Sequence, residues 1–405
     1  MDFVFECDAY NELDHHTPVA AELLKLGNSV TFLFGSDGNL SSDPRIDYLQ
    51  TWPLFRTLYL HDLLTPNGRR VFRLLSKLFF GRVLRNKSNS FRLGGLVKFS
   101  AALGIFRHHQ TLNIDCAVSG WGDPSSVLMT SALARKRPIV ALPHGYPCVK
   151  NFDFNSHINS IIRKTGMPPD FSLRNEFDAY VIATQRNRKM LVAWSMSEAT
   201  LKVWGNARFS PQWVETLRSI LPPVQIALRD ESIQRVLVLL PATTSGFNKG
   251  ALDSLIHRLA QLNIFLILKP HTRDAVESAL TSEWPMEQSN VYIATTEHTT
   301  KLIEYADTVL NFATGTAIEA LLLGKRLVFL RYLTNNQLSW DDCAGIQIAH
   351  SEDAVVEVVE NRSWQSNLTE ASNYLEQEIF ADATVGNPPR MYADELVEIA
   401  SGSKR

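Results

Sequence analysis

The stretch from Ile303 to Leu330 constrains the fold most, because it contains a strand, a turn, a helix and a second strand in one run. Residues 306–312 are apolar enough for a short buried strand, and residues 317–323 are apolar at helical spacing. Gly324 can end that helix with a positive φ, and residues 327–330 read as the next buried strand. A repeating unit of this kind predicts a parallel sheet covered by helices.

The turn in this stretch, Thr314-Gly315-Thr316, has the composition of an anion site. Thr316 and Glu319 have the spacing of a capping box, which predicts that the helix begins there. The first N–H groups of a helix lack internal acceptors, two hydroxyl groups add donors, and Gly315 allows close approach of the backbone. The alternative is an ordinary strand-to-helix connection capped by threonine.

A second polar segment follows a predicted strand at residues 264–268. That strand delivers Lys269-Pro270-His271 and then Thr272-Arg273 at its carboxyl end. Ligands of open α/β sheets bind beyond the carboxyl ends of the strands. We therefore expect Lys269, His271 and Arg273 to hold phosphate together with the turn at Thr314.

The first half of the chain shows the same alternation of strands and helices. Residues 3–5 and 29–34 are predicted strands, and residues 11–16 are predicted to form a polar loop. Thr17 is expected to cap the following helix and Pro18 to take its first position. There is no GxGxxG fingerprint, so a dinucleotide cofactor is not expected. A later buried strand, residues 138–142, delivers His144-Gly145 and then Lys150.

Length and composition predict two globular domains. The chain has 405 residues, 45% of them hydrophobic, and we place the domains at 1–215 and 216–405 with the last helix able to pack back on the first domain. The four cysteines are scattered, as expected of a reducing cytoplasm. The start resembles no signal peptide, and no run of about 20 apolar residues predicts a membrane-spanning helix.

Residues 67–109 form a basic block within a chain whose net charge is −2. No acidic residue occurs between Asp62 and Asp115, whereas ten lysines and arginines do. Apolar residues recur at helical spacing among them, which is typical of a cationic amphipathic helix at an anionic membrane surface or a lipid-linked acceptor. The alternative is a helix packed on a sheet with a solvated basic face. No nucleic-acid motif accompanies the charge, so we do not expect a nucleic-acid partner.

Together, His144-Gly145 with Lys150, Lys269-Pro270-His271 and Thr314-Gly315-Thr316 with Glu319 resemble the glycerophosphotransferases of teichoic acid synthesis and related capsule transferases. The segment at residues 205–209 also resembles the linker of bacterial surface-polysaccharide transferases. This resemblance implies the GT-B architecture, which consists of two facing Rossmann-like α/β domains. Asn311-Phe312-Ala313 stands where teichoic-type enzymes usually have Asp, and this difference favours sugar transfer over glycerol phosphate transfer.

The resemblance implies a glycosyltransferase that moves a sugar from a CMP-, CDP- or UDP-linked donor to a surface polysaccharide or lipid-linked acceptor. His144 is the first choice for the base that deprotonates the acceptor, because imidazole titrates near neutral pH. Rivals are Asp14, His15 and His16, and a retaining reaction would instead need a carboxylate nucleophile such as Asp8, Glu12 or Asp14. Gly145 and Lys150 are expected on the acceptor side.

We expect no metal and no other cofactor, because no acidic cluster requires one and the nucleotide sugar is a substrate. The predicted location is the cytoplasm, with contact at the inner face of the membrane through residues 67–109. Two alternatives remain: a polyol-phosphate transferase of the teichoic acid or capsule type, and a non-hydrolysing UDP-sugar 2-epimerase. A binding subunit without catalytic activity in a polysaccharide assembly is a third.

Overall fold

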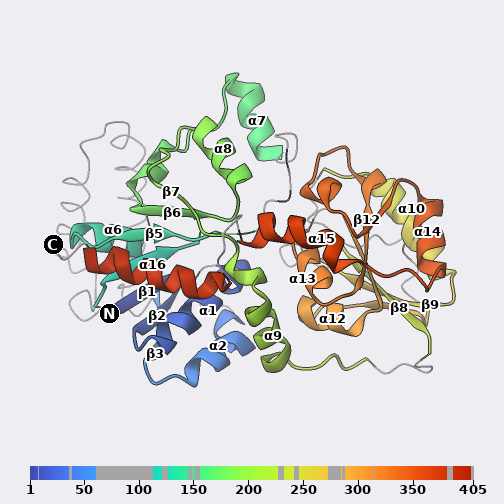
Figure 1. The fold of residues 1–405 in the computed structure, drawn as a ribbon, viewed down its shortest axis with the longest axis horizontal. Helices are drawn as coiled ribbons and strands as arrows, with labels where there is room; N and C mark the ends of the chain where they lie inside the picture. The colour runs from blue at the N-terminus through green and yellow to red at the C-terminus, as the bar shows by residue number, and fades with distance from the viewer. Residues whose placement is uncertain are drawn as a thin grey trace. The chain divides into compact units, whose positions relative to one another are not determined.

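The computed structural model divides into two compact units, each containing one parallel sheet (Figure 1). The first unit comprises Met1–Gly145, Asp170–Trp213 and Glu378–Arg405, and the second comprises Tyr146–Pro169 and Val214–Gln377. The structure describes residues 1–7, 9–35, 39–60, 113–120, 126–143, 145, 148, 150, 156–226, 232–240, 246–271, 284, 288–312, 314–380 and 386–402. The basic block at 67–109 therefore lies outside the described residues.

The sheet of the first unit has seven parallel strands in the order β3-β2-β1-β4-β5-β6-β7. Its strands are β1 (Asp2–Cys7), β2 (Ser29–Phe34), β3 (Phe55–Tyr59), β4 (Cys116–Ser119), β5 (Ile139–Ala141), β6 (Ala179–Ile182) and β7 (Leu201–Val203). In the register, Val4 pairs with Thr31 on one side and with Ala117 on the other. The order reverses between β1 and β4, and this place is called the switch point. Ligands of such sheets bind beyond the carboxyl ends of the strands at the switch point.

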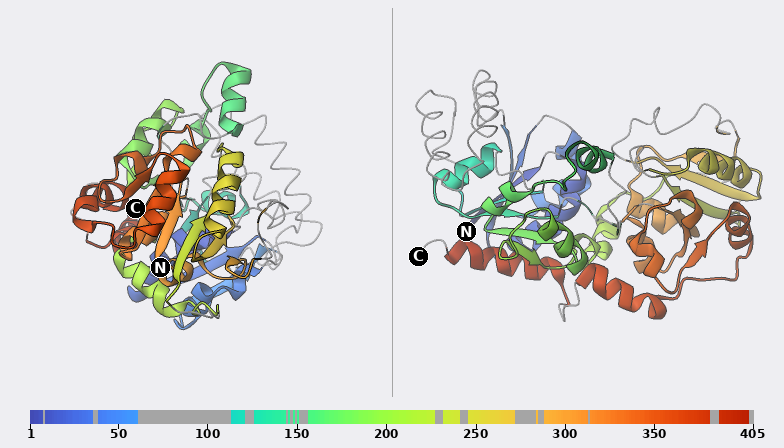
Figure 2. Two further views of the ribbon diagram at one scale, coloured as in Figure 1. Left: turned by 90° about the vertical axis from the view of Figure 1, so that its right-hand side faces the viewer. Right: turned by 90° about the horizontal axis from the view of Figure 1, so that it is seen from above.

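Helices cover both faces of the first sheet. They are α1 (Tyr10–Lys25), α2 (Pro44–Gln50), α6 (Val127–Ala134), α8 (Gln185–Ala193) and α16 (Pro388–Gly402), with short 3₁₀ turns at Asn39–Ser42, Ser172–Glu176 and Ala207–Phe209. α16 packs along α1, as two views show (Figures 1 and 2). The Tyr392 hydroxyl of α16 donates to the Gly205 carbonyl at 2.7 Å, which ties the last helix to the segment after β7.

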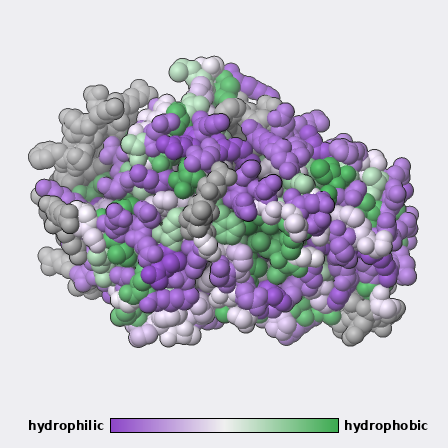
Figure 3. Space-filling view, in the orientation of Figure 1, coloured by the Kyte–Doolittle hydropathy of each residue, from purple (hydrophilic) through white to green (hydrophobic). Residues whose placement is uncertain are grey.

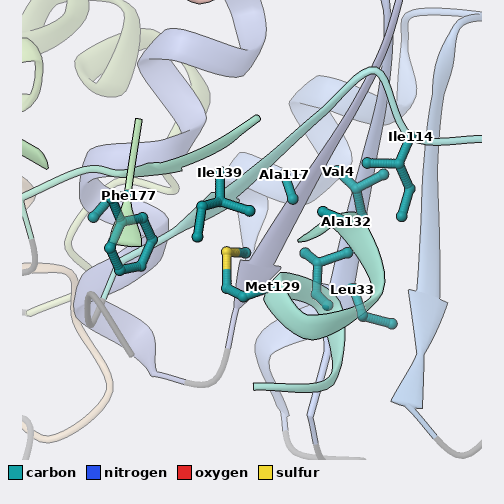
Figure 4. Close-up of a cluster of buried hydrophobic side chains, with 10 residues drawn as sticks. Val4, Leu33, Ile114, Ala117, Met129, Ala132, Ile139 and Phe177 are labelled. Atoms are coloured by element: carbon teal, nitrogen blue, oxygen red, sulfur yellow. The ribbon is translucent and has the colours of Figure 1, made fainter. Parts of the chain in front are cut away.

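The core of the first unit follows from the two-residue alternation of its strands. Val4, Ala117 and Ile139 point to one face and pack on Met129 and Ala132 of α6 (Figure 4). The intervening side chains of β1 point to the opposite face and pack under α1. Because helices cover both faces of the sheet, successive residues of its strands are buried, and the strands are continuous hydrophobic runs in the sequence.

The predicted loop at residues 11–16 is wrong, because α1 begins at Tyr10 and contains that segment. Pro18 lies inside the helix rather than at its first position. The Thr17 hydroxyl donates to the Leu13 carbonyl at 2.5 Å instead of capping the helix. The polar sequence favoured a loop, but Glu12, Asp14, His15 and His16 are buried within the helix.

The sheet of the second unit has six parallel strands in the order β10-β9-β8-β11-β12-β13, and its switch point lies between β8 and β11. The strands are β8 (Gln234–Leu239), β9 (Ile264–Lys269), β10 (Val291–Ile293), β11 (Thr308–Asn311), β12 (Arg326–Leu330) and β13 (Gln347–Ala349). The predicted strands at 264–268 and 327–330 correspond to β9 and β12.

Helices of the second unit form two groups. α10 (Lys249–Ala260) packs with α14 (Glu352–Glu360), and α12 (Thr299–Tyr305) packs with α13 (Ala317–Leu322), which in turn contacts α15 (Leu368–Leu375). The remaining segments of this unit are α7 (Ser156–Thr165) and 3₁₀ turns at Arg331–Leu333 and Ser339–Asp342. α9 (Pro211–Ile220) and a π-helix at Glu376–Phe380 contain the points where the chain passes from one unit to the other. The predicted α/β class with two parallel-sheet domains is confirmed.

Among the helices that the structure describes, none is both long and apolar enough to cross a membrane. Hydrophilic side chains cover most of the face shown in Figure 3, and hydrophobic ones form separate patches.

Candidate functional site

The turn after β11 lies at the switch point of the second sheet, where a ligand of this fold is expected. Asn311, the last residue of β11, accepts from the Thr314 N–H at 3.2 Å through its side-chain oxygen. The Thr314 hydroxyl oxygen accepts from the Thr316 N–H at 3.3 Å and lies 3.3 Å from the Thr316 hydroxyl. The side chains of Asn311 and Thr314 therefore fix the shape of the turn from within.

The turn keeps donors that the described part of the chain does not satisfy. Asn311 is 0% exposed, and its Nδ2 has no hydrogen-bond partner. The Gly315 N–H likewise has no acceptor among the described residues. A buried donor without an acceptor costs about 1–3 kcal/mol, so a ligand or water that accepts here would recover that cost. The sequence signal for Asn311 is an amide that ends an otherwise apolar strand.

The helix α13 begins at Ala317, directly after Thr316, as predicted, but the predicted capping box at Thr316 is wrong. Thr316 has helical backbone angles and makes no side-chain cap hydrogen bond. Glu319 is buried instead, and its Oε2 accepts from the Thr300 hydroxyl of α12 at 2.5 Å. Glu319 thus joins α12 to α13. Since α13 has only six residues, the anion site predicted here rests on the donors of the turn rather than on a helix terminus.

We expect Thr300→Val to lower the free energy of unfolding by about 1.5–3 kcal/mol, because it removes a buried hydrogen bond to a carboxylate. Chemical denaturation of the variant measures the loss. Thr299→Val, one residue earlier and half-buried, is the matched control. Equal stability of the Thr300 variant and the unsubstituted protein would show that Glu319 has another principal partner.

Lys269 lies at the end of β9, but its ammonium group is held by the protein. Its Nζ donates to the Ala294 carbonyl at 3.2 Å and to the Glu297 carbonyl at 2.8 Å. Burial lowers the pKa of Lys269, and the nearby Glu297 carboxylate opposes that change. Lys269 therefore orders the connection between β10 and α12 at the carboxyl edge of the sheet. Its contact with a phosphate stays a prediction.

His271 is half-buried just past Lys269, and its role in holding a donor also stays a prediction. Arg273 lies outside the described residues. β9 and β11 are both neighbours of β8, so the two predicted phosphate segments end at the same edge of one sheet.

The connection between β10 and α12 contains polar residues that the sequence analysis overlooked. The Tyr292 hydroxyl donates to the Glu297 carboxylate, and this bond, with burial, raises the pKa of Tyr292 to about 12. His298 caps α12, since its Nδ1 accepts from the Thr300 N–H at 3.2 Å. An acidic residue and a histidine before a helix could have signalled a cap at this edge.

Asp14 belongs to a buried charge network in the first unit. One of its oxygens pairs with Arg45 and the other lies 2.8 Å from Arg208. Arg45 is 0% exposed and also binds Asp43 through two nitrogens, at 2.7 and 2.8 Å. Burial alone would lower the pKa of Arg45, but Asp14 and Asp43 raise it well above its ordinary value. Asp14 is therefore engaged by two guanidinium groups.

The neighbouring histidines are also interior residues. His15 and His16 are both buried in α1, and His16 Nδ1 lies 3.5 Å from the Cys7 thiol. The His16 ring also makes an edge contact with Phe5. The proposed roles of Asp14 and His15 in catalysis stay predictions.

The motif after β5 is described only in part. His144 lies outside the described residues, and Gly145 has open space where a Cβ would stand. Lys150 is assigned to the second compact unit, where its N–H donates to the Gln337 carbonyl at 2.8 Å and its ammonium pairs with Asp342. The functional assignments of Gly145 and Lys150 stay predictions.

The sequence matches no protein-family model, and no curated protein matches it either. Solved structures do match the fold. The UDP-GlcNAc 2-epimerase of Neisseria meningitidis bound to UDP-GlcNAc has a TM-score of 0.55 at 13% identity, covering 98% of this chain and 100% of that one. The UDP-GlcNAc 2-epimerase of Methanocaldococcus jannaschii gives the same values.

A third similar structure is the wall teichoic acid polymerase TagF, with a TM-score of 0.53 at 10% identity, covering 100% of this chain and 90% of that one. Similarity at these identities is similarity of fold. The chain therefore has the two-domain α/β fold that these proteins share, in the GT-B class that the sequence resemblance implied.

Proposed function

We propose that this protein is a glycosyltransferase that takes a sugar from a nucleotide-activated donor. The observation that carries the proposal is the turn after β11, which places the buried Nδ2 of Asn311, the Gly315 N–H and the Thr314 hydroxyl at the switch point of the second sheet. The amide Nδ2 and the N–H are hydrogen-bond donors, and the Thr314 hydroxyl, which donates to the Thr316 hydroxyl here, can turn its proton to a ligand. Phosphate oxygens are acceptors. A nucleotide phosphate is the ligand that fits this set best.

The fold supports the choice of a nucleotide sugar. The similar structures include an enzyme bound to UDP-GlcNAc and a polymerase of wall teichoic acid. CMP-, CDP- and UDP-linked sugars share a phosphate next to the sugar, which is the group that the turn would hold. The acceptor in this proposal is a growing polysaccharide or a lipid-linked glycan, and residues 67–109 would bring the protein to an anionic membrane surface.

The proposed chemistry is electrostatic on the donor side. Negative charge builds on the leaving phosphate as the glycosidic bond breaks, and preorganised donors aimed at that charge stabilise the transition state. The turn after β11 would provide them, with Lys269 adding positive charge and His271 a hydrogen-bond donor at the same edge. His144 would remove the proton of the acceptor hydroxyl. These roles are the ones that the sequence motifs predict, and the proposed mechanism uses no metal ion.

A UDP-sugar 2-epimerase is the second candidate, because several of the similar structures are enzymes of that name. The two candidates differ in their need for an acceptor. Incubation with UDP-GlcNAc alone, followed by NMR of the sugar, separates them. A new 2-epimer formed without acceptor would support the epimerase and contradict the transferase.

We expect a nucleotide to raise the melting temperature of this protein, since a ligand present at 100 times its Kd stabilises the folded state by about 2.7 kcal/mol. Thermal-shift measurements with CMP, CDP, UDP and GDP provide the test. Thr314→Val should weaken the nucleotide that binds by about tenfold or more, because one hydrogen bond to a charged group contributes about 1.5–3 kcal/mol.

Thr369→Val, at an exposed position in α15 of the same unit, is the matched control and should leave the affinity unchanged. If none of the four nucleotides changes the melting temperature, the proposed function is wrong. If a nucleotide binds equally well to the Thr314 variant, the phosphate lies elsewhere.

A further inference from the structure

Tyr10 is an aromatic side chain held rigidly at the carboxyl edge of the first sheet. It is the first residue of α1, and it follows β1, the strand at the switch point. Its ring is stacked on the Arg45 guanidinium, 4.5 Å from the Arg45 Cζ to the ring centroid. Its hydroxyl hydrogen-bonds Asp43. Despite these contacts, 37% of its surface is exposed.

The first turn of α1 is fixed as firmly as the ring. The Ala9 N–H donates to the Glu12 carboxylate at 3.0 Å. The other Glu12 oxygen reaches across to β4, where it would lie 2.7 Å from a Cβ placed on Gly120. The first turn of α1 therefore spans the switch point between β1 and β4, with Tyr10 on the side of α2.

The buried charges beneath Tyr10 cost desolvation free energy, and their contribution to folding stability does not by itself account for their presence. Arg45, Asp14 and Asp43 are all buried, and replacing a buried ion network by apolar residues of similar volume is often neutral or stabilising. A network of this kind is therefore better understood as a positioning device. Tyr10 is its most exposed member, so the ring is the part that can meet a ligand.

The chemistry of the ring selects the ligand. An aromatic face offers an apolar surface with a negative quadrupole, which suits the C–H face of a sugar ring, and a ring locked in place loses little entropy on binding. A nucleotide phosphate would gain nothing from this face. The carboxyl edge at a switch point is where ligands of doubly wound sheets bind.

We propose that Tyr10 is a stacking platform for a sugar ring of the acceptor, with the Arg45, Asp14, Asp43 and Arg208 network holding it in place. This assignment rests on the proposed glycosyltransferase function. It places the acceptor saccharide in the first unit, on a residue distinct from the donor turn after β11. Arg45 and Asp43 are positioning residues in this assignment, because they act through the Tyr10 ring.

The test is saturation-transfer NMR with methyl glycosides of glucose, galactose, N-acetylglucosamine and ribose as probes. The unsubstituted protein should transfer saturation to the C–H protons of at least one glycoside. Tyr10→Ala should reduce that transfer fivefold or more, whereas Tyr10→Phe, which keeps the ring, should retain most of it. Leu54→Ala, an exposed apolar position of the same unit, should have no effect.

Nucleotide thermal shifts on the same variants separate this inference from the proposed function. Tyr10→Ala should respond to a nucleotide as the unsubstituted protein does. If a nucleotide binds but no glycoside does, or if Tyr10→Ala binds the glycoside equally well, the platform is wrong and the proposed function stands. If Tyr10→Ala also loses the nucleotide response, the assignment to the acceptor alone is overturned.

Discussion

Asp43→Ala is expected to lower the free energy of unfolding by about 3–5 kcal/mol, because it removes the bidentate partner of the fully buried Arg45 guanidinium and leaves Asp14 as its one carboxylate. The variant also loses the cap of α2, since the Arg45 N–H donates to the Asp43 carboxylate at 2.9 Å. Urea denaturation followed by tryptophan fluorescence measures the effect, and Trp213 contacts Tyr48 of the same helix.

Asp47→Ala is the matched control, because Asp47 lies in the first turn of α2 and is exposed. It should change stability by less than about 0.5 kcal/mol, as surface substitutions usually do. The double variant Asp43→Ala with Arg45→Met should recover part of the loss, since the incompletely paired guanidinium is then removed and Asp14 still pairs with Arg208. A double variant as unstable as the sum of its parts would contradict the buried-charge explanation.

Gly205→Ala is the second substitution with a large expected effect. Gly205 has a φ of +79°, and an added Cβ would overlap the Ile379 carbonyl oxygen of the π-helix. That carbonyl also accepts from the Asn206 N–H at 2.6 Å, so it has little room to move. We expect the backbone strain and the overlap together to cost about 2–5 kcal/mol.

Gly27→Ala isolates the backbone part of that cost. Gly27 has a φ of +77°, and an added Cβ would meet nothing within 4 Å. It should therefore lose only about 1–2 kcal/mol, measured by the same denaturation experiment. Equal losses of unfolding free energy at the two positions would show that the π-helix shifts to make room for the added methyl group.

The fold was predictable because both sheets are parallel and covered on two faces. Such strands are short apolar runs, and residues 29–34, 264–268 and 327–330 were recognised from that pattern. The start of α1 was missed for the opposite reason. Its first two turns bury polar residues that are satisfied by Arg45, Arg208 and Cys7, and no local pattern shows that partners from distant segments are present.

The candidate site was predictable in position but not in detail. The residue types at Thr314 and Lys269 located the carboxyl edge of the second sheet, because strand ends and small polar turns are local features. The prediction of a capping box was wrong because Glu319 binds Thr300 of α12, and α12 is separated from α13 in the sequence by the strand β11. The Lys269 ammonium binds backbone carbonyls that sequence periodicity cannot place. His144 and Arg273 lie outside the described residues and stay predictions.

The packing of α16 on α1 has a consequence for synthesis on the ribosome. α1 (Tyr10–Lys25) emerges long before α16 (Pro388–Gly402), the helix that packs against it. The contiguous stretch from Val214 to Gln377 can collapse while the chain is still being made, since domains generally fold as units during translation. The sheet of the first unit therefore keeps part of its apolar surface uncovered until α16 has been synthesised.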